Sequence, residues 1–175
     1  MEHLNVEIKA KCNNPQTIRN YLQLNNAKFA GTDRQTDTYF NVSAGRLKLR
    51  EGNIENNLIF YNRNNQPGPK CSFFRLLPVA DPDNYKKIMK DAMGIKTVVI
   101  KTREIYYIGN VKFHIDEVEN LGSFIEIEAG NLLAPKTKTE LEEQCNFYLQ
   151  QFGIRAEDLF SESYSDLLTG KQATG

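Results

Sequence analysis

The chain has 175 residues, 40% of them apolar and 25% charged, which is ordinary for a globular protein with a hydrophobic core. Its 22 basic and 22 acidic residues cancel, so a globally basic nucleic-acid-binding protein is not indicated. Cys12, Cys71 and Cys145 show no Cys-x-x-Cys spacing, so neither a zinc site nor a disulfide framework is indicated. With no apolar run near about 18 residues and no secretory leader, the chain is predicted to be reduced, cytoplasmic and free of membrane spans.

The first half of the chain consists mainly of short runs that predict strands. Apolar and charged residues alternate strictly over residues 4–12, which is the pattern of a half-buried strand. Asn14 and Pro15 are typical of a helix start, because Asn caps a helix and Pro suits its first position. The elements expected here are strands at 4–12, 34–42, 46–50, 58–63 and 71–79, and a helix at 15–26.

The second half begins with the strongest helix pattern in the chain. Asp81 and Pro82 start it, apolar residues recur at helical spacing, and Gly94 is placed to end it. The expected elements are this helix, strands at 97–107, 111–118 and 123–128, a helix from Thr139 to Phe152 with a capping box, and a terminal helix or turn at 156–168. Residues 1–170 are expected to form a single domain, and residues 171–175 a frayed tail.

The stretch from Ser123 to Glu128 alternates apolar and acidic side chains. On a strand, Glu126 and Glu128 would share one face with Phe124, because successive side chains point to opposite faces. Two aligned carboxylates can bind a divalent cation. A single Glu-x-Glu is more often a solvated face, so the charges on the other strands have to decide between these interpretations.

About eight strands with three or four helices predict an α+β domain with a mainly antiparallel sheet. Most of the strands have one apolar face and one charged face, and two architectures fit this pattern. In an open sheet, helices cover the apolar face and the charged face meets water. In a closed barrel, the charged faces point into the lumen and the helices pack outside.

The charged faces of the predicted strands are mainly basic. They carry ten basic residues against four acidic ones, although the whole chain is neutral. The signs are segregated by strand, whereas a solvated face usually mixes them. This segregation favours a site where Lys and Arg bind a polyanion and carboxylates bind Mg²⁺ or Mn²⁺. The basic residues are Lys9, Lys11, Arg46, Lys48, Arg50, Arg63, Arg75, Lys101, Arg103 and Lys112, and the acidic ones are Glu7, Asp116, Glu126 and Glu128.

Five motifs, in this order along the chain, resemble the CYTH domain, or triphosphate tunnel metalloenzyme, superfamily. That superfamily includes class IV adenylyl cyclases and thiamine triphosphatases. The motifs are Glu7-Ile-Lys-Ala-Lys11, Asp37-Thr-Tyr-Phe40, Gly45-Arg-Leu-Lys-Leu-Arg50, Lys101-Thr-Arg103, and His114-Ile-Asp116 through Leu121-Gly-Ser-Phe-Ile-Glu-Ile-Glu128. The resemblance implies an eight-stranded antiparallel β tunnel, a closed barrel with a charged interior and helices outside. It also implies end-on binding of a triphosphate with one or two divalent cations, Mg²⁺ or Mn²⁺.

The resemblance assigns roles to individual residues as well. In the family's Glu-x-Glu-x-Lys motif, Glu7 matches the first Glu and Lys11 the Lys, and Lys9 stands where the second Glu is expected. The implied catalytic residues are Glu7, Lys11 and Glu126, and the implied metal ligands are Glu7, Asp116, Glu126 and Glu128. The implied triphosphate-binding residues are Lys9, Lys11, Lys48, Arg50, Arg63, Lys101 and Arg103. His114 has no metal partner by spacing, and we expect a structural role or a contact with substrate.

The leading functional hypothesis is a metal-dependent enzyme acting on a triphosphate, either a cyclase that converts ATP to cyclic AMP and pyrophosphate or a triphosphatase. The expected substrates are a nucleoside triphosphate, thiamine triphosphate or polyphosphate. A non-catalytic polyphosphate- or nucleotide-binding module is the alternative, motivated by Lys9. Stacking of single-stranded nucleic acid is a weaker hypothesis, because aromatic residues on alternating strands usually pack a core. The oligomeric state stays open, with a homodimer among the options.

Overall fold

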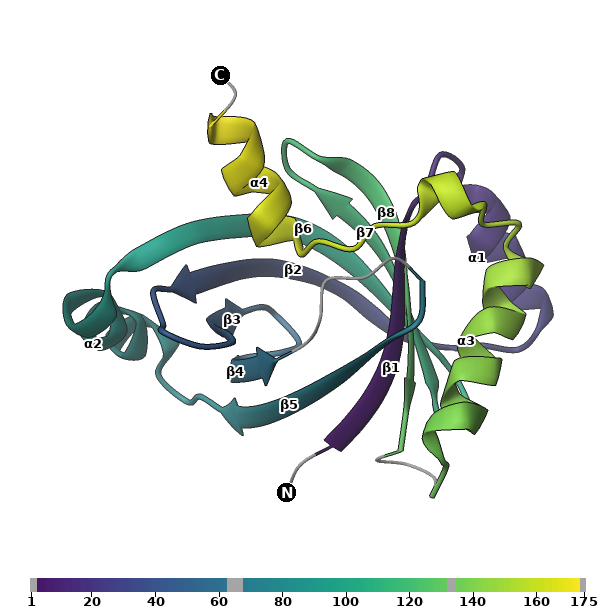
Figure 1. Ribbon diagram of the computed structural model, residues 1–175, viewed down its shortest axis with the longest axis horizontal. Helices are drawn as coiled ribbons and strands as arrows, with labels where there is room; N and C mark the ends of the chain where they lie inside the picture. Colours follow the sequence, from purple (N-terminus) through teal and green to yellow (C-terminus); the bar gives the residue numbers. More distant parts are fainter. Residues whose placement is uncertain (1–2, 63–67, 132–134, 174–175) are drawn as a thin grey trace.

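Every neighbouring pair of strands in the sheet is antiparallel, and the sheet closes on itself (Figure 1). The structure is a computed structural model that describes residues 3–62, 68–131 and 135–173. Around the ring the order is β1-β5-β4-β3-β2-β6-β7-β8, and β8 pairs with β1. The strands are β1 (His3–Lys11), β2 (Lys28–Phe40), β3 (Arg46–Glu51), β4 (Asn57–Asn62), β5 (Lys70–Pro78), β6 (Ile95–Ile108), β7 (Val111–Val118) and β8 (Gly122–Gly130). The helices are α1 (Pro15–Leu24), α2 (Pro82–Met93), α3 (Lys138–Gln151), a short 3-10 helix (Ala156–Asp158) and α4 (Tyr164–Ala173).

This topology confirms the α+β fold and the closed, eight-stranded tunnel. Most elements begin and end within two residues of the predicted bounds, and two differ by more. β2 begins at Lys28 rather than Arg34. The sequence does not indicate this first part because its residues do not alternate, and its pairing with β6 is irregular between Phe29 and Gly31. α4 continues to Ala173, into the stretch predicted to be a frayed tail.

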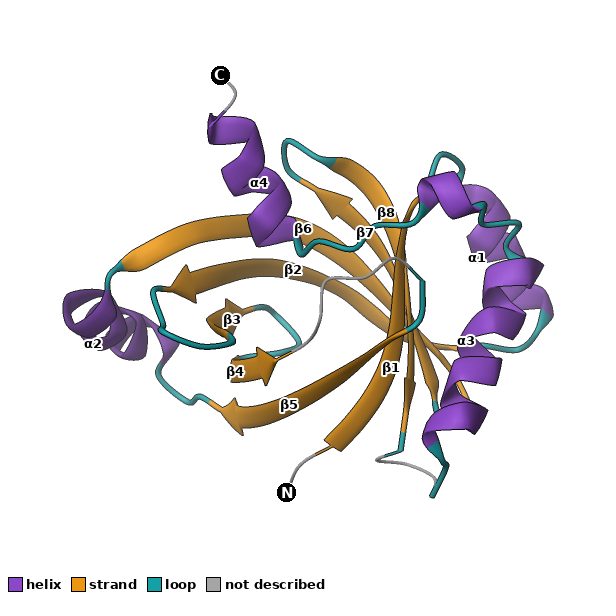
Figure 2. Ribbon diagram, in the orientation of Figure 1, coloured by secondary structure: helices purple, strands orange, loops and turns teal. Residues whose placement is uncertain are grey.

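One side of the ring is covered by α1 and α3, which are purple in Figure 2. Alternation in β1 places Val6 and Ile8 on the outer face, where they pack in one buried cluster with Leu22 of α1 and Leu141 of α3. The other face of β1 is directed into the ring. The alternating pattern therefore separates an apolar exterior beneath the helices from a polar interior.

The segment before α4 crosses one end of the ring. The backbone N–H of Phe160 donates to the Lys9 carbonyl oxygen at 2.9 Å, and the buried Lys70 ammonium donates to the carbonyl oxygens of Phe160 and Ser161 at 3.0 and 3.1 Å. Tyr164 then packs in a second buried cluster that closes this end. Among the described helices, none combines the length and apolarity that a membrane span requires.

The helix-covered side of the ring supplies a test of the packing. Leu22 is fully buried and Leu24, two residues later in α1, is 82% exposed. We expect Leu22→Ala to lower the free energy of unfolding by about 2–5 kcal/mol, because it leaves a cavity in the core. Leu24→Ala is the matched control and should change it by less than about 0.5 kcal/mol. Urea unfolding would measure both, and equal effects would contradict this packing.

Candidate functional site

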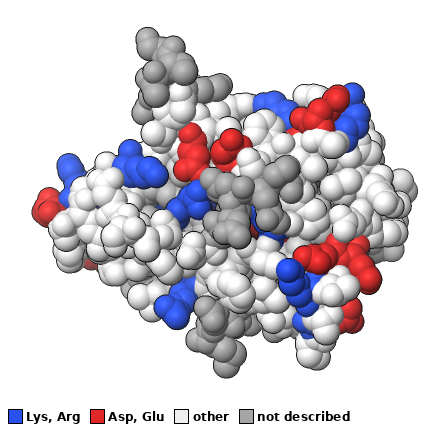
Figure 3. Space-filling view, viewed as in Figure 1, with Lys and Arg blue, Asp and Glu red and all other residues white. Residues whose placement is uncertain are grey.

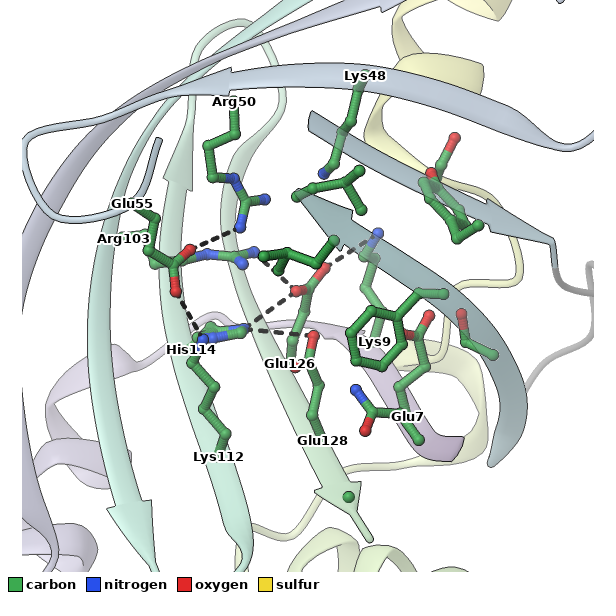
Figure 4. A pocket seen from close by; sticks show the side chains of 18 of the residues that line it. Glu7, Lys9, Lys48, Arg50, Glu55, Arg103, Lys112, His114, Glu126 and Glu128 are labelled. Atoms are coloured by element: carbon green, nitrogen blue, oxygen red, sulfur yellow. Dashed lines mark hydrogen bonds and ion pairs between the residues drawn. The ribbon is translucent and has the colours of Figure 1, made fainter. Parts of the chain in front are cut away.

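A cavity of about 380 Å³ lies inside the ring, and residues from all eight strands line it (Figure 4). Strand alternation places these side chains, since the opposite faces of the same strands form the apolar exterior. The charged residues that line it are Lys9, Lys48, Arg50, Lys101, Arg103 and Lys112, together with Glu7, Glu55, Glu126 and Glu128. The structure therefore brings together most of the residues predicted to bind triphosphate or metal.

Asp37 of β2 is the centre of the largest charge cluster. Its buried carboxylate accepts hydrogen bonds from Lys48 at 2.7 Å, Lys101 at 2.8 Å and Arg50 at 2.9 Å. Burial acts to raise the pKa of Asp37, but the attraction of Arg50, Lys101 and Lys48 prevails and holds it well below its usual range. For Lys101, burial prevails over the attraction of Asp37, and with Arg50 beside it lowers the pKa to about 7. Three cations thus share one carboxylate, and each retains capacity for a further anion.

A second buried carboxylate, Asp116 of β7, binds Arg103. The guanidinium donates to both Asp116 oxygens, and the Tyr164 hydroxyl donates to one of them at 2.8 Å. Asp116 is 1% exposed and is not among the residues that line the cavity, although it shares the inward face of β7 with Lys112 and His114. The predicted metal ligand Asp116 is therefore hydrogen-bonded to Arg103 and Tyr164 and does not line the cavity with Glu126 and Glu128.

Glu126 is where three donors converge, as Figure 4 shows. Lys9 lies 3.2 Å from one carboxylate oxygen, and Arg103 and His114 lie 2.7 and 3.3 Å from the other. Register explains this, because Lys9 of β1 and His114 of β7 are both the Cα partners of Glu126. Although burial acts to raise the pKa of Glu126, Arg103 and Lys9 hold it well below its usual range.

Three residues could bind a metal ion together. Ligand atoms of His114, Glu126 and Glu128 all lie within 4.8 Å of one another, and Glu7 is the Cα partner of Glu128. Burial and the charge of Arg103 lower the pKa of His114, which favours the neutral imidazole that binds metals. The donor set fits a divalent cation: carboxylates suit Mg²⁺ and Mn²⁺, and an imidazole suits transition metals better.

Glu55 is a residue of this cavity that the sequence analysis missed. It follows β3 in a polar segment where no helix or strand is predicted, and nothing in that segment distinguishes it. Its carboxylate binds Arg50 at 2.8 Å and Lys112 at 2.9 Å, and so joins two strands that are not neighbours in the ring. Asp37 was part of one of the five motifs, but no role was assigned to it. The feature that could have identified it is an Asp within a predicted strand, because Asp is disfavoured there.

Several of the basic residues predicted for the charged faces lie away from the cavity. Lys11 donates to the Leu121 carbonyl oxygen at 2.6 Å and lies over the Phe124 ring, because the segment before α4 crosses β1 at Lys9. Arg46 binds Asp166 of α4, and Arg75 is exposed. Arg63, predicted to bind triphosphate, lies outside the described residues.

The face of the molecule in Figure 3 carries its charges differently. On the face in Figure 3, the described lysines and arginines stand in separate groups, most of them beside acidic side chains. This arrangement is unlike the extended basic stripe that an electrostatic nucleic-acid surface presents. The charged residues gathered in the cavity, rather than those on this face, therefore indicate the candidate functional site.

Fold and site together define an antiparallel tunnel protein whose interior is lined by paired cations and carboxylates. Residues 3–164 match the family model of the CYTH domain, and the chain belongs to that family. A Methanocaldococcus jannaschii protein named as a candidate adenylate cyclase is 26% identical, over 94% of this chain and 98% of its own.

Two solved structures share the fold. A Pyrococcus horikoshii protein has a TM-score of 0.81 at 24% identity and covers 93% of this chain and 98% of its own. A Hippeastrum protein, described as a candidate adenylyl cyclase with a dominant triphosphatase activity, has a TM-score of 0.66 at 13% identity, covering 98% and 96%.

The Asp37 cluster predicts a defined dependence of stability on charge and pH. We expect Asp37→Asn to lower the free energy of unfolding by about 3–5 kcal/mol at pH 7, since it leaves three buried cations without their carboxylate. Because the folded-state pKa of Asp37 is depressed, its contribution is complete above the unfolded-state value of about 3.9 and fades as the pH falls below it.

Urea unfolding of wild type and Asp37→Asn at several pH values would test this. The difference in unfolding free energy between wild type and Asp37→Asn should be present at pH 5 and should narrow below about pH 4, where Asp37 becomes protonated in the unfolded state. Asp91→Asn, at an exposed position on α2, is the matched control and should change stability little. A difference that widens as the pH falls below about 5 would contradict the assignment of Asp37.

Proposed function

We propose that this chain is a divalent-metal-dependent enzyme that acts on a triphosphate. The observation that carries the proposal is the convergence of six cationic side chains and four carboxylates in one cavity inside the ring. Arg and Lys side chains fixed in this way suit phosphate oxygens. Membership of the CYTH family, and the names of its adenylate cyclase and triphosphatase relatives, support it further.

Two reactions fit this cavity. In a cyclase reaction, the ribose 3′-hydroxyl of ATP attacks the α-phosphate and pyrophosphate leaves. In hydrolysis, water attacks the terminal phosphate of a nucleoside triphosphate, thiamine triphosphate or polyphosphate. The M. jannaschii relative is named for the first reaction and the Hippeastrum protein for both. Both reactions need the same phosphate-binding residues, so these do not separate them.

Different residues of the cavity bind the phosphates and the metal ion. Lys48, Arg50 and Lys101, positioned by Asp37, bind phosphate oxygens from one side of the cavity, and Arg103, positioned by Asp116, binds them from another. Both carboxylates orient cations before substrate arrives, which reduces the cost of ordering on binding. Glu126, Glu128 and His114 would bind Mg²⁺ or Mn²⁺, whose chemistry here is to neutralise charge on the phosphates.

The cavity also revises how the family's Glu-x-Glu-x-Lys motif lies on β1. Asn5, Glu7 and Lys9 line the cavity, and Lys11 does not. We therefore assign Glu7 to the second Glu of the motif and Lys9 to its Lys, two residues earlier than predicted from the sequence. In this register Lys9 is not a departure, and Asn5 stands where the first Glu is expected.

The proposed function is tested by a product assay with ATP, thiamine triphosphate and tripolyphosphate, each with Mg²⁺ or Mn²⁺. We expect turnover of at least one of them. Glu128→Gln should lower the turnover about 100-fold or more, because it removes a metal ligand. Glu143→Gln, at an exposed position on α3, is the matched control and should leave it unchanged.

The same assay separates the proposal from its alternative. The absence of turnover with every triphosphate and metal would overturn the enzyme assignment. Tight triphosphate binding by calorimetry without metal and without turnover would instead establish a non-catalytic binding module. One observation favours that alternative: both oxygens of Glu126 are already engaged by cations of the chain itself, Lys9 and Arg103.

Substitutions of two lysines on β1 test the revised alignment of the Glu-x-Glu-x-Lys motif. Lys9→Met should weaken tripolyphosphate binding about ten-fold or more, because it removes a cation from the cavity. Lys11→Met should change it less than about two-fold, since Lys11 lies outside the cavity. Calorimetry gives both affinities, and urea unfolding verifies that the variants are folded. The reverse order of effects would restore the register predicted from the sequence.

A further inference from the structure

Glu55 lies between two cations of the cavity, as Figure 4 shows. One oxygen of its carboxylate accepts from Arg50 at 2.8 Å, and the other accepts from Lys112 at 2.9 Å. Although burial acts to raise the pKa of Glu55, the attraction of Lys112 and Arg50 holds it below its usual range, so the group is an anion at neutral pH. The space between Arg50 and Lys112 therefore already contains an anion that belongs to the chain itself.

This pair of cations lies away from the end of the cavity that Tyr164 closes. On β7, Asp116 accepts from the Tyr164 hydroxyl, and Lys112 lies further along the same face of the strand. On β3, Arg46 binds α4 at the closed end, and Arg50 lies further along that face. Arg50 and Lys112 are therefore both directed toward the opposite end.

Solvent reaches the cavity near these residues. The side chains of Glu55 and Lys112 are each 21% exposed, whereas those of Lys101 and Arg103 are 1% and 3% exposed. Ions from solution therefore reach the pair formed by Arg50 and Lys112 before they reach the deeper cations.

The segment that contains Glu55 is fixed to β2 by Asp33. The buried Asp33 carboxylate accepts from the backbone N–H groups of Ile54 and Glu55 at 2.9 and 3.2 Å. A Cβ at Gly52 would lie 2.6 Å from both oxygens of that carboxylate, so this close approach requires glycine. Because the backbone is held in this way, the Glu55 carboxylate can leave its two cations by a change of side-chain rotamer alone.

Arg50 binds two carboxylates, and only one of them can leave without a large loss of stability. Asp37, which is 1% exposed, accepts from Nε and one terminal nitrogen of Arg50 and also binds Lys48 and Lys101. Glu55 accepts from the other terminal nitrogen. Displacing Asp37 would leave three buried cations without their partner, whereas displacing Glu55 leaves Arg50 paired with Asp37. A phosphate oxygen in place of the Glu55 carboxylate would restore charge-assisted hydrogen bonds to both cations.

Glu55 also differs from the carboxylates that could bind a metal ion. Among the described residues, the group with that geometry consists of His114, Glu126 and Glu128, and Glu55 is not part of it. A metal ion bound to that group would therefore not take up the Glu55 carboxylate when phosphate displaces it.

We propose that Glu55 is an internal competitor of the ligand: its carboxylate occupies a phosphate-binding site between Arg50 and Lys112, and a phosphate group displaces it on binding. This inference rests on the proposed function, because it requires a phosphorylated ligand, and it adds a regulatory contact to the same cavity. Without ligand, Glu55 keeps the two cations paired. With ligand, Lys112 and the outer nitrogen of Arg50 become donors to phosphate oxygens.

Calorimetry of tripolyphosphate binding to wild type and Glu55→Gln, without metal, tests the inference. Glu55→Gln should bind about ten-fold or more tightly, because its neutral amide competes poorly with phosphate for Arg50 and Lys112. Glu51→Gln is the matched control, since Glu51 pairs with Lys86 at 2.8 Å, has a side chain that is 18% exposed and does not line the cavity. It removes the same charge and should change the affinity less than about two-fold, because solvent screens a charge outside the ring.

A double-mutant cycle with Lys112 distinguishes competition from a general loss of negative charge. In wild type, ligand binding exchanges one anionic partner of Lys112 for another, so Lys112→Met should weaken tripolyphosphate binding less than about two-fold. In Glu55→Gln, Lys112 gains an anionic partner only from the ligand, and the same substitution should weaken binding about ten-fold. Equal effects in the two backgrounds would overturn the inference.

A second variant, Glu55→Asp, keeps the charge and shortens the side chain by one methylene, so its carboxylate reaches the two cations less well. If wild type binds tripolyphosphate and neither Glu55 variant binds it more tightly, the inference is wrong and the triphosphate enzyme stands. If Glu55→Gln instead weakens binding, and only when Mn²⁺ is present, Glu55 serves the metal site and the inference is again wrong.

The proposed function fails in a different way. If neither wild type nor any variant binds tripolyphosphate, with or without Mn²⁺, the proposed function fails and this inference fails with it. Tripolyphosphate binding by Glu55→Gln but not by wild type would support the inference. Urea unfolding of each variant verifies that it is folded.

Discussion

The carboxylate of Asp37 is the interaction on which the interior of this protein depends. A closed ring with charged inner faces takes many cations partly out of water, and such burial is costly unless each cation has a partner. Asp37 supplies a partner to three of them, and Asp116 and Glu55 supply others. The six lining cations thus meet four lining carboxylates and two further carboxylates, Asp37 and Asp116, that bond to lining cations. The interior is close to neutral, so under the proposed function anions are bound by oriented donors rather than by a large net charge.

Local pattern predicted most of the fold. Alternation on β1 and β8 separated the apolar faces from the charged ones, and the turn and cap residues located nearly every element. Pattern alone left an open sheet and a closed barrel equally acceptable, because both bury the same apolar faces. Closure depends on pairing β1 with β8, two strands more than 100 residues apart. The resemblance to a family predicted a closed sheet without naming the strands that pair, and periodicity within each strand contains no information on this pairing.

The site was less predictable for the same reason. Lys9 meets Glu126 because a particular register aligns them, and a register between distant strands cannot be read from either strand. Glu55 and Tyr164 come from a loop and from the C-terminal segment, where no periodic pattern marks a residue as facing the interior. The sequence also overstated the excess of basic charge in the interior. It placed Lys11, Arg46 and Arg75 on the charged faces of the strands, but none of these three side chains lines the cavity.

Glu126 shows how anion and cation sites in such a cavity depend on each other. Its carboxylate now accepts from Lys9 and Arg103, which are also the donors that a phosphate would use. Under the proposed function, phosphate binding by these two side chains makes the Glu126 oxygens more available to a divalent cation. Linkage requires the reverse as well, so that a cation bound at Glu126 releases Lys9 and Arg103 for phosphate. A cavity whose ion pairs are internally satisfied can therefore stay stable without ligand and still bind both partners together.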